Sequence, residues 1–174
     1  MSSLTARDRI QLWVLDVLGK RGMYLGRRSA KLHVALYRRT RGRVGSRLPG
    51  WHQARILLVD HVGAKSGAKR TSPVLYCEHG DAVAVVGSKA GQATHPAWFH
   101  NLKANPDTTI QIGADLRSVR ARLATDEERD HLWPKLVATF PAYDIYQRNA
   151  KHRQLPVVIL DPRWPDQRRA GVGR

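Results

Sequence analysis

Residues 63–105 read GAKSGAKRTSPVLYCEHGDAVAVVGSKAGQATHPAWFHNLKAN and contain two Gly-rich turns separated by short apolar runs. The turns carry Lys65, Lys69, Arg70 and Lys89. Glycine lets a backbone turn sharply and approach a ligand closely, and the exposed amides of such turns form concave sites for anions. Because cations flank both turns, a phosphate or a carboxylate is the natural ligand.

On both sides of this stretch, β-branched runs alternate with turn signals. Strands are predicted at residues 55–62, 71–78, 82–88, 108–112, 116–124 and 155–160, with hairpin turns at 79–81 and 113–115. Helices are predicted at 96–104 and 125–140, where Thr125 opens a capping box and Pro134 bends or divides the helix. Many short strands with two inserted helices predict an α+β fold built on a small, mainly antiparallel barrel.

The N-terminal third has a different character. Residues 5–18 repeat apolar side chains at helical spacing, and 29–39 form a second helical stretch before a Gly- and Arg-rich loop. Residues 1–55 hold 13 Lys or Arg against two acidic residues, whereas residues 56–163 hold 14 against 11. We therefore expect a basic helical extension at 1–54, a barrel domain at 55–163 and a basic tail at 164–174.

The composition narrows the function classes. A net charge of +16 on 174 residues makes an anionic partner the first expectation. Cys77 is the one cysteine, so neither an internal disulfide nor a thiolate metal cluster is expected. The sequence also lacks an H-E-x-x-H metal motif, a Ser nucleophile motif, a long apolar span and a signal peptide. These features predict a cytoplasmic protein without a bound metal.

Four motifs in register carry a family resemblance. They are G-x-K-S-G-x-x-R-T-x-P at 63–73, V-V-G-S-K-A-G at 85–91, H-P-A-W-F-H-N-L-K-A-N-P at 95–106 and L-W-P-K-L-V-A-T-F-P-A-Y-D-I-Y-Q at 132–147. With these motifs, residues 32–162 resemble the deazaflavin-dependent nitroreductase family, whose members are split β-barrels that bind coenzyme F420. That cofactor carries a phosphodiester and a carboxylate-rich oligoglutamate tail, which matches the basic turns.

The resemblance implies a cofactor site and a set of catalytic residues. The implied cofactor-binding residues are Lys65, Ser66, Arg70, Thr71, Ser72, Pro73, Leu75, Gly87, Ser88, Lys89, Trp98, Phe99, Asn101 and Tyr143. Ser88, Tyr143 and Tyr146 are the implied catalytic residues, because their hydroxyls can donate to an acceptor oxygen as it gains negative charge. The plainer alternatives are a solvated basic turn, a strand-end hydroxyl and core aromatics.

Two positions depart from the family pattern. Ala64 stands where the family has an arginine, so one phosphate-directed guanidinium is missing, and Lys69 and Arg70 are the neighbours that could compensate. Phe140 stands where the family often has a third tyrosine, which changes the acceptors that the site can reduce.

The function that the resemblance implies is hydride transfer from reduced deazaflavin to a small electron-poor acceptor. A quinone, a nitroaromatic compound and an activated alkene are the acceptor classes, and FMN, which related split barrels use, is the less favoured cofactor. In such enzymes the cofactor carries the hydride chemistry and the protein supplies position and electrostatics.

Two alternatives follow from the charge. A nucleic-acid-binding protein would neutralise phosphates with these cations, but no recognition helix or RNP-like pattern accompanies them, so no specific nucleic acid is expected. The N-terminal helix, with Trp13 on its apolar side, fits peripheral contact with the inner face of an anionic membrane. Docking of that helix on the barrel explains the same pattern.

Overall fold

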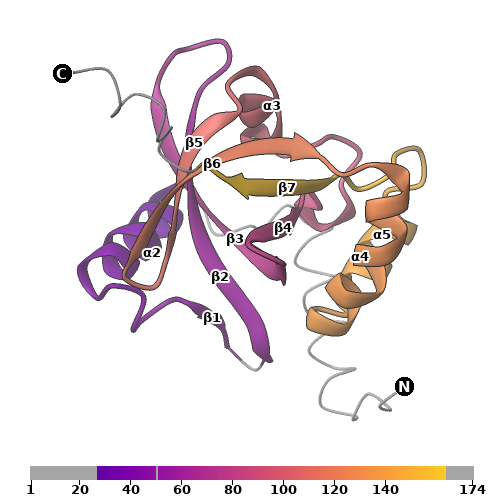
Figure 1. Ribbon diagram of the computed structural model, residues 1–174, viewed down its shortest axis with the longest axis horizontal. Coiled ribbons are helices and arrows are strands. Elements are labelled where there is room, and N and C mark those ends of the chain that lie inside the picture. Colours follow the sequence, from indigo (N-terminus) through magenta and orange to yellow (C-terminus); the bar gives the residue numbers. More distant parts are fainter. Residues whose placement is uncertain (1–26, 50, 164–174) are drawn as a thin grey trace, which may run out of the picture.

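The computed structural model describes residues 27–49 and 51–163, and the helix predicted at 5–18 and the tail at 164–174 lie outside these residues. The strands of the described part are β1 (Arg47–Leu48), β2 (Trp51–Val62), β3 (Lys69–His79), β4 (Ala82–Val86), β5 (Asp107–Ile112), β6 (Asp115–Leu123) and β7 (Val157–Pro162). All pairs are antiparallel, in the order β1-β2-β3-β4-β7-β6-β5. Pairing of β2 with β5 closes six of them into a barrel (Figure 1).

Helices surround this barrel. They are α2 (Arg27–Arg39), α3 (Ala97–Ala104), α4 (Asp126–Thr139) and α5 (Ala142–Asn149), with a short 3₁₀ turn at Lys89–Gly91. Figure 1 shows α2 and the α4–α5 pair on opposite sides of the barrel. Tyr37 fixes α2 to the barrel, because its buried hydroxyl donates to the carbonyl of Ile56 (3.0 Å) and accepts from the amide of Gly113 (3.0 Å).

The predicted α+β barrel and its two hairpins are confirmed. Each hairpin has a two-residue turn, and Gly80 and Gly113 supply the left-handed residue that such turns need. Three details of the prediction are wrong. Strand β2 begins at Trp51 instead of residue 55, β4 ends at Val86 so that residue 88 lies outside it, and α5 is a separate helix that was not predicted. Pro134 lies within α4 and does not divide it.

The core has two clusters of buried side chains. One contains Leu57 and Val59 of β2, the α3 side chains Trp98 and Phe99, and buried side chains from each of the strands β3 to β7. The other contains the α4–α5 side chains that pack against β3, β4 and β7. Every residue of β4 is buried because the two clusters cover its two faces.

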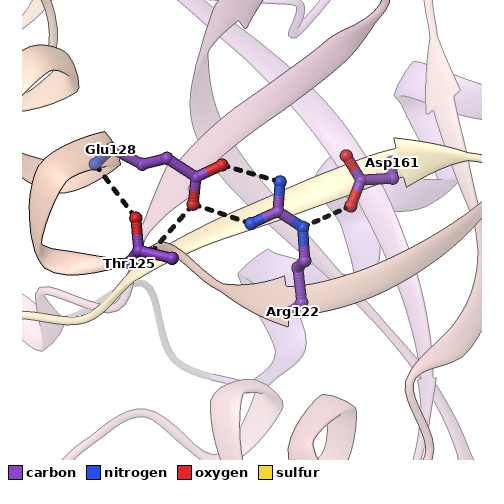
Figure 2. Close-up of polar contacts among 4 residues, drawn as sticks. All are labelled: Arg122, Thr125, Glu128 and Asp161. Atoms are coloured by element: carbon purple, nitrogen blue, oxygen red, sulfur yellow. Dashed lines mark hydrogen bonds and ion pairs between the residues drawn. The ribbon is translucent and has the colours of Figure 1, made fainter.

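The first turn of α4 is held to the sheet by a four-residue cluster (Figure 2). Thr125 and Glu128 form the predicted capping box, in which the Glu128 amide donates to the Thr125 hydroxyl and the Glu128 carboxylate accepts from the Thr125 amide. Arg122 of β6 donates to both Glu128 oxygens (2.7 and 2.8 Å) and to Asp161 of β7 (2.7 Å). Hydrogen bonds from Arg122 lower the pKa of Glu128 to about 2. The cluster thus orients the α4–α5 pair relative to the barrel.

Candidate functional site

An opening runs along the first half of β3. The ladder between β3 and β4 spans only Tyr76 to His79, and β4 ends at Val86. Within the described part of the chain, residues 69–75 therefore pair with β2 alone, and residues 71–75 are all half-buried. A strand edge with one partner offers backbone donors and acceptors to a flat ligand. Most of the predicted cofactor residues lie along this edge or in the two turns beside it.

The two hydroxyl residues on this edge point to opposite faces, as the alternation along a strand requires. The hydroxyl of Thr71 donates to Asp60 (2.5 Å) and accepts from Arg38 of α2 (3.1 Å), so it belongs to an ion-pair cluster on the α2 side. The hydroxyl of Ser72 instead lies 3.0 Å from the ring of His61. Side chains of Thr71 and Ser72 thus cannot line the same face of a ligand.

The first turn spans residues 63–68, is exposed from Ala64 onward, and carries Lys65 and Ser66. The Gly63 amide donates to the Ala68 carbonyl (2.9 Å), and the Gly67 amide donates to the Gly63 carbonyl (2.8 Å). Lys65, Lys69 and Arg70 form no ion pair with any residue that the structure describes. Their charges are therefore available to an anionic ligand.

A buried polar relay holds the first turn to α3. The amide of Ala64 donates to Asn101 Oδ1 (2.9 Å), so the Asn101 NH₂ group faces His61 and donates to its Nδ1 (2.8 Å). Nε2 of His61 then carries the proton toward the Ser72 hydroxyl. Asn101 and His61 are 7 % and 6 % exposed. Burial, followed by the charge of Arg70, lowers the pKa of His61, which keeps the ring neutral as the relay requires.

The second turn follows β4 and contains Gly87, Ser88 and Lys89. Lys89 (φ 45°) and Ala90 (φ 47°) are both left-handed, as is Gly91 (φ 73°). Left-handed backbone disfavours residues other than glycine by roughly 1–2 kcal/mol each, so the turn stores strain. The Lys89 ammonium donates to the Thr94 hydroxyl (2.7 Å).

The second turn packs directly on α5, which carries the two predicted tyrosines. A Cβ at Gly91 would lie 2.6 Å from the Tyr146 carbonyl oxygen, so only glycine allows this approach. Tyr143 and Tyr146 are buried, and the Phe140 ring lies 5.3 Å and 6.2 Å from their rings. Trp51 adds a fourth ring, 5.8 Å from Phe140. The structure thus brings Ser88 and the two tyrosines to one side of the barrel.

The three predicted cofactor residues on α3 point their side chains to different surroundings. Asn101 faces the first turn, and Trp98 is buried in the core cluster of β2. Phe99 lines two cavities of about 280 and 320 Å³, whose other walls include Leu123 and residues from β6, β7 and α4. None of the other predicted cofactor-binding residues lines either cavity. Phe99 therefore serves a different surface from Asn101.

Two residues of the site were missed by the sequence analysis. His61 received no role there, although the alternation of Leu57, Val59 and His61 places it on an inward face and could have indicated a buried histidine. The other is Arg153, whose guanidinium donates to the carbonyls of Gly87 and Ser88 in the second turn. No local pattern distinguishes it from its neighbours Lys151 and His152.

Comparison with known proteins assigns the chain to a family of reductases. The family described as F420H(2)-dependent quinone reductase matches residues 29–162, which include the open strand edge, both turns and α5. The chain belongs to this family. The match confirms the resemblance found in the sequence, and it covers every motif that carried it.

Individual relatives agree with this assignment. An F420H(2)-dependent quinone reductase of Mycobacterium tuberculosis is 39 % identical over 144 residues, which are 80 % of this chain and 94 % of the relative. The solved F420-H2-dependent reductase FDR-A is 39 % identical, with a TM-score of 0.56 over 61 % of this chain and 93 % of its own. A structure described as a domain-swapped dimer is 34 % identical, with a TM-score of 0.59 over 75 % and 95 % of the two chains. The split barrel is therefore the fold of this family.

Proposed function

We propose that this chain binds reduced coenzyme F420 and catalyses hydride transfer to a quinone-type small-molecule acceptor. The observation that carries the proposal is the family match across the open β3 edge and both basic turns. When bound, the cofactor supplies the hydride. The described residues fit it, because Lys65 and Arg70 are exposed cations that pair with no carboxylate within residues 27–49 and 51–163 and could hold its anionic tail.

Lys65, Arg70 and Lys89 are the residues that we propose hold the tail. The guanidinium of Arg70 can donate two parallel hydrogen bonds to one phosphate or carboxylate, whereas each lysine acts as a point charge. Ala64 offers no such side chain, and its amide is already used by Asn101. Each charge-assisted contact to a desolvated anion contributes about 1.5–3 kcal/mol.

The double substitution Lys65→Ala/Lys89→Ala tests this assignment. Two lost contacts should weaken the binding of F420 by about two orders of magnitude or more, as followed by the fluorescence of the deazaflavin. The matched control is Lys31→Ala/Lys135→Ala, which removes two exposed charges elsewhere and should bind as the parent does. If the site variant also binds as the parent does, the tail is held elsewhere.

On the acceptor side, we assign hydrogen-bond donation to Ser88, Tyr143 and Tyr146. Hydride that reaches a quinone places negative charge on an oxygen, and a donor fixed at that oxygen stabilises the transition state more than the ground state. Packing of Gly91 on α5 supports this assignment, because it joins the turn of Ser88 to the helix of Tyr146. In this assignment the three hydroxyls donate hydrogen bonds, and no protein side chain acts as a nucleophile.

Replacing Tyr146 by phenylalanine isolates the hydroxyl. Turnover with a quinone should fall about tenfold or more, the low end for the loss of one oriented donor, while the affinity for F420 stays close to that of the parent. Tyr37→Phe is not a suitable control, since that hydroxyl holds α2 to the barrel. Turnover that is unchanged in both Tyr146→Phe and Ser88→Ala would assign these residues to the shape of the pocket.

A second proposal is peripheral contact with the inner face of an anionic membrane. Leu32 and Leu36, one helical turn apart on α2, are 70 % and 42 % exposed, and the exposed Lys31 and Arg39 flank them. Apolar and basic side chains on one helix favour an anionic lipid surface. No helix among the described residues is both long enough and apolar enough to cross a bilayer.

Vesicle binding tests this surface. Removal of residues 1–28 and, separately, Leu32→Ser/Leu36→Ser should each reduce adsorption to phosphatidylglycerol vesicles and leave F420 affinity within a few-fold of the parent. Leu116→Ser, on β6, removes an equally exposed leucine as the control. Parent-like adsorption by both the truncated chain and the double variant would overturn the membrane proposal.

A further inference from the structure

One arginine reaches the back of the second turn from the segment that follows α5. Arg153 Nε donates to the carbonyl of Gln92 (2.8 Å), Nη2 to the carbonyl of Ser88 (2.7 Å), and Nη1 to the carbonyl of Gly87 (3.3 Å) and to Nδ1 of His95 (3.1 Å). Four of its five N–H donors are thus directed at one loop. Only a planar guanidinium fork can reach acceptors arranged in this way.

This arginine is not part of an ion pair within residues 27–49 and 51–163. It is half-buried, and its acceptors are three carbonyl oxygens and one ring nitrogen. Because a guanidinium cannot accept a hydrogen bond, Nδ1 of His95 must be unprotonated, and His95 is neutral in this arrangement. A charged side chain devoted to neutral backbone acceptors indicates a role in fixing the shape of the loop.

The loop needs such fixing because its backbone is strained. Lys89 and Ala90 are consecutive left-handed residues, which relaxation to negative φ would relieve. Two contacts oppose that relaxation. Arg153 holds the carbonyls of Gly87 and Ser88 before the strained pair, and the close approach of Gly91 to α5 holds the chain after it.

The segment that carries Arg153 is itself tied to α5 and α4. Gln147 Nε2 donates to the Arg153 carbonyl (3.0 Å), and its Oε1 accepts from the Leu155 amide (2.9 Å). Arg129 of α4 donates to the Leu155 carbonyl (2.8 Å) and stacks on Trp133, with its Cζ 4.3 Å from the ring centroid. The guanidinium of Arg153 therefore projects from an anchored segment.

We propose that Arg153 is a positioning residue that holds turn 87–91 in its left-handed conformation. By doing so it sets where the Ser88 hydroxyl and the Lys89 ammonium lie relative to Tyr146. This inference rests on the proposed function for its catalytic consequence, since those three groups are assigned there to the acceptor and to the cofactor tail. The effect of Arg153 on the conformation of the turn does not depend on that function.

The test compares Arg153→Ala and Arg153→Lys with Arg148→Ala, which removes an exposed arginine of α5. The Ala variant should lose about tenfold or more in kcat/KM for a quinone, because small displacements of positioned groups have large effects on rate. Arg153→Lys should lose nearly as much kcat/KM as Arg153→Ala, because one ammonium group cannot reach the acceptors that the planar guanidinium contacts. Millimolar guanidinium, but not methylammonium, should restore activity to the Ala variant. Arg148→Ala should match the parent.

A purely structural role would give a different result. Arg153→Ala would then lower the Tm while kcat and KM stayed at parent values, and guanidinium would have no effect on the rate. That outcome overturns the proposal. So does a parent-like kcat/KM in both Arg153 variants.

NMR couplings of the backbone test the effect of Arg153 on the turn without any measurement of activity. In ¹⁵N-labelled protein, the HN–Hα couplings and NOE pattern of Lys89 and Ala90 should report left-handed φ in the parent and negative φ in Arg153→Ala, with recovery upon addition of guanidinium. If the parent neither binds F420 nor reduces quinones, the proposed function fails, yet these couplings still decide the hold of Arg153. Unchanged couplings in Arg153→Ala would refute it.

Discussion

The two turns that flank the open edge of β3 are built in contrasting ways. In turn 63–68, residues 64–68 are exposed and Gly67 is left-handed, and the Ala64 amide ties the turn to α3 by donating to Oδ1 of the buried Asn101. Turn 87–91 places Lys89 and Ala90 in left-handed backbone and is clamped between Arg153 and α5. The first can adapt to a variable anionic tail, whereas the second presents its groups at fixed positions. The strained backbone thus lies in the turn that positions Ser88 and Lys89.

Adding one methyl group to each turn should expose this difference most strongly. Gly91→Ala places a Cβ 2.6 Å from the Tyr146 carbonyl oxygen at φ 73°, whereas Gly67→Ala has the same backbone problem at φ 64° with no atom within 4 Å. We expect Gly67→Ala to lower the free energy of unfolding by about 1–2 kcal/mol. Gly91→Ala should lower it by about 2–5 kcal/mol, because overpacking adds to the backbone term.

Urea denaturation of the parent and the two variants measures both effects. Gly91→Ala should also reduce quinone turnover, since relief of the clash displaces either the turn or α5. Equal losses of stability in the two variants would mean that the second turn is not held more tightly than the first.

The anchor of the first turn is the next test. Asn101→Ala removes the acceptor of the Ala64 amide and the donor to His61, and an unsatisfied buried group costs about 1–3 kcal/mol. F420 affinity should fall as well, because Lys65 loses its support. Asn105→Ala, at the exposed end of α3, serves as the control. Parent-like F420 affinity in Asn101→Ala would show that the first turn needs no anchor.

Local features of this fold could be predicted from the sequence, whereas the long-range contacts of the second turn could not. Barrel strands, hairpins and the capping box of α4 follow from alternation and turn chemistry, which are local, and they were predicted. The clamp of Arg153 joins residues 65 positions apart, and no local pattern encodes it. Helix α5 was missed because only Phe140 and Pro141, the C-cap of α4 and the N-cap of α5, separate the two helices.

The sequence predicted the candidate site residues as one set, but in the structure their side chains lie on different faces of β3 and α3. Thr71 and Ser72 are neighbours in sequence and lie on opposite faces of β3. Phe99 and Asn101 are two positions apart on α3 and serve different surfaces. Motif membership places a residue near the site, whereas strand and helix geometry decides what its side chain contacts.

Acidification should weaken the anchor of the first turn. Burial and Arg70 lower the pKa of His61 from its ordinary value of 6.5, although Asp60 acts in the opposite direction. The unfolded chain then binds the proton more strongly than the folded chain, so the free energy of unfolding falls as pH drops below 6.5. His61→Gln should make this fall shallower, and His152→Gln, an exposed histidine, should not.

The measurement is denaturation at several pH values between about 7.5 and 5. His95, whose pKa is also lowered, mainly by burial, contributes in the same direction and is present in all the variants. An identical pH dependence in the parent and His61→Gln would contradict the neutral relay.

The smallest effect is expected far from both turns, at the first turn of α4. Arg122 lowers the pKa of Glu128 from 4.5 to about 2, so its contribution to stability is full above pH 4.5 and is lost as pH falls toward 2. Arg122→Gln should flatten this acid-side loss in a plot of Tm against pH, and quinone turnover should stay unchanged at neutral pH. A steeper acid-side loss in the variant would contradict the assignment of this ion pair.

Hydride transfer from reduced F420 to a quinone is the activity that we propose for this chain. The most direct measurement follows the absorbance of reduced F420 with the purified protein and a soluble quinone, beside a parallel reaction with reduced FMN. We expect protein-dependent oxidation that requires the quinone and saturates with F420, and we expect reduced FMN to be a poor substitute. Oxidation no faster than without the protein, or equal rates with reduced FMN, would contradict it.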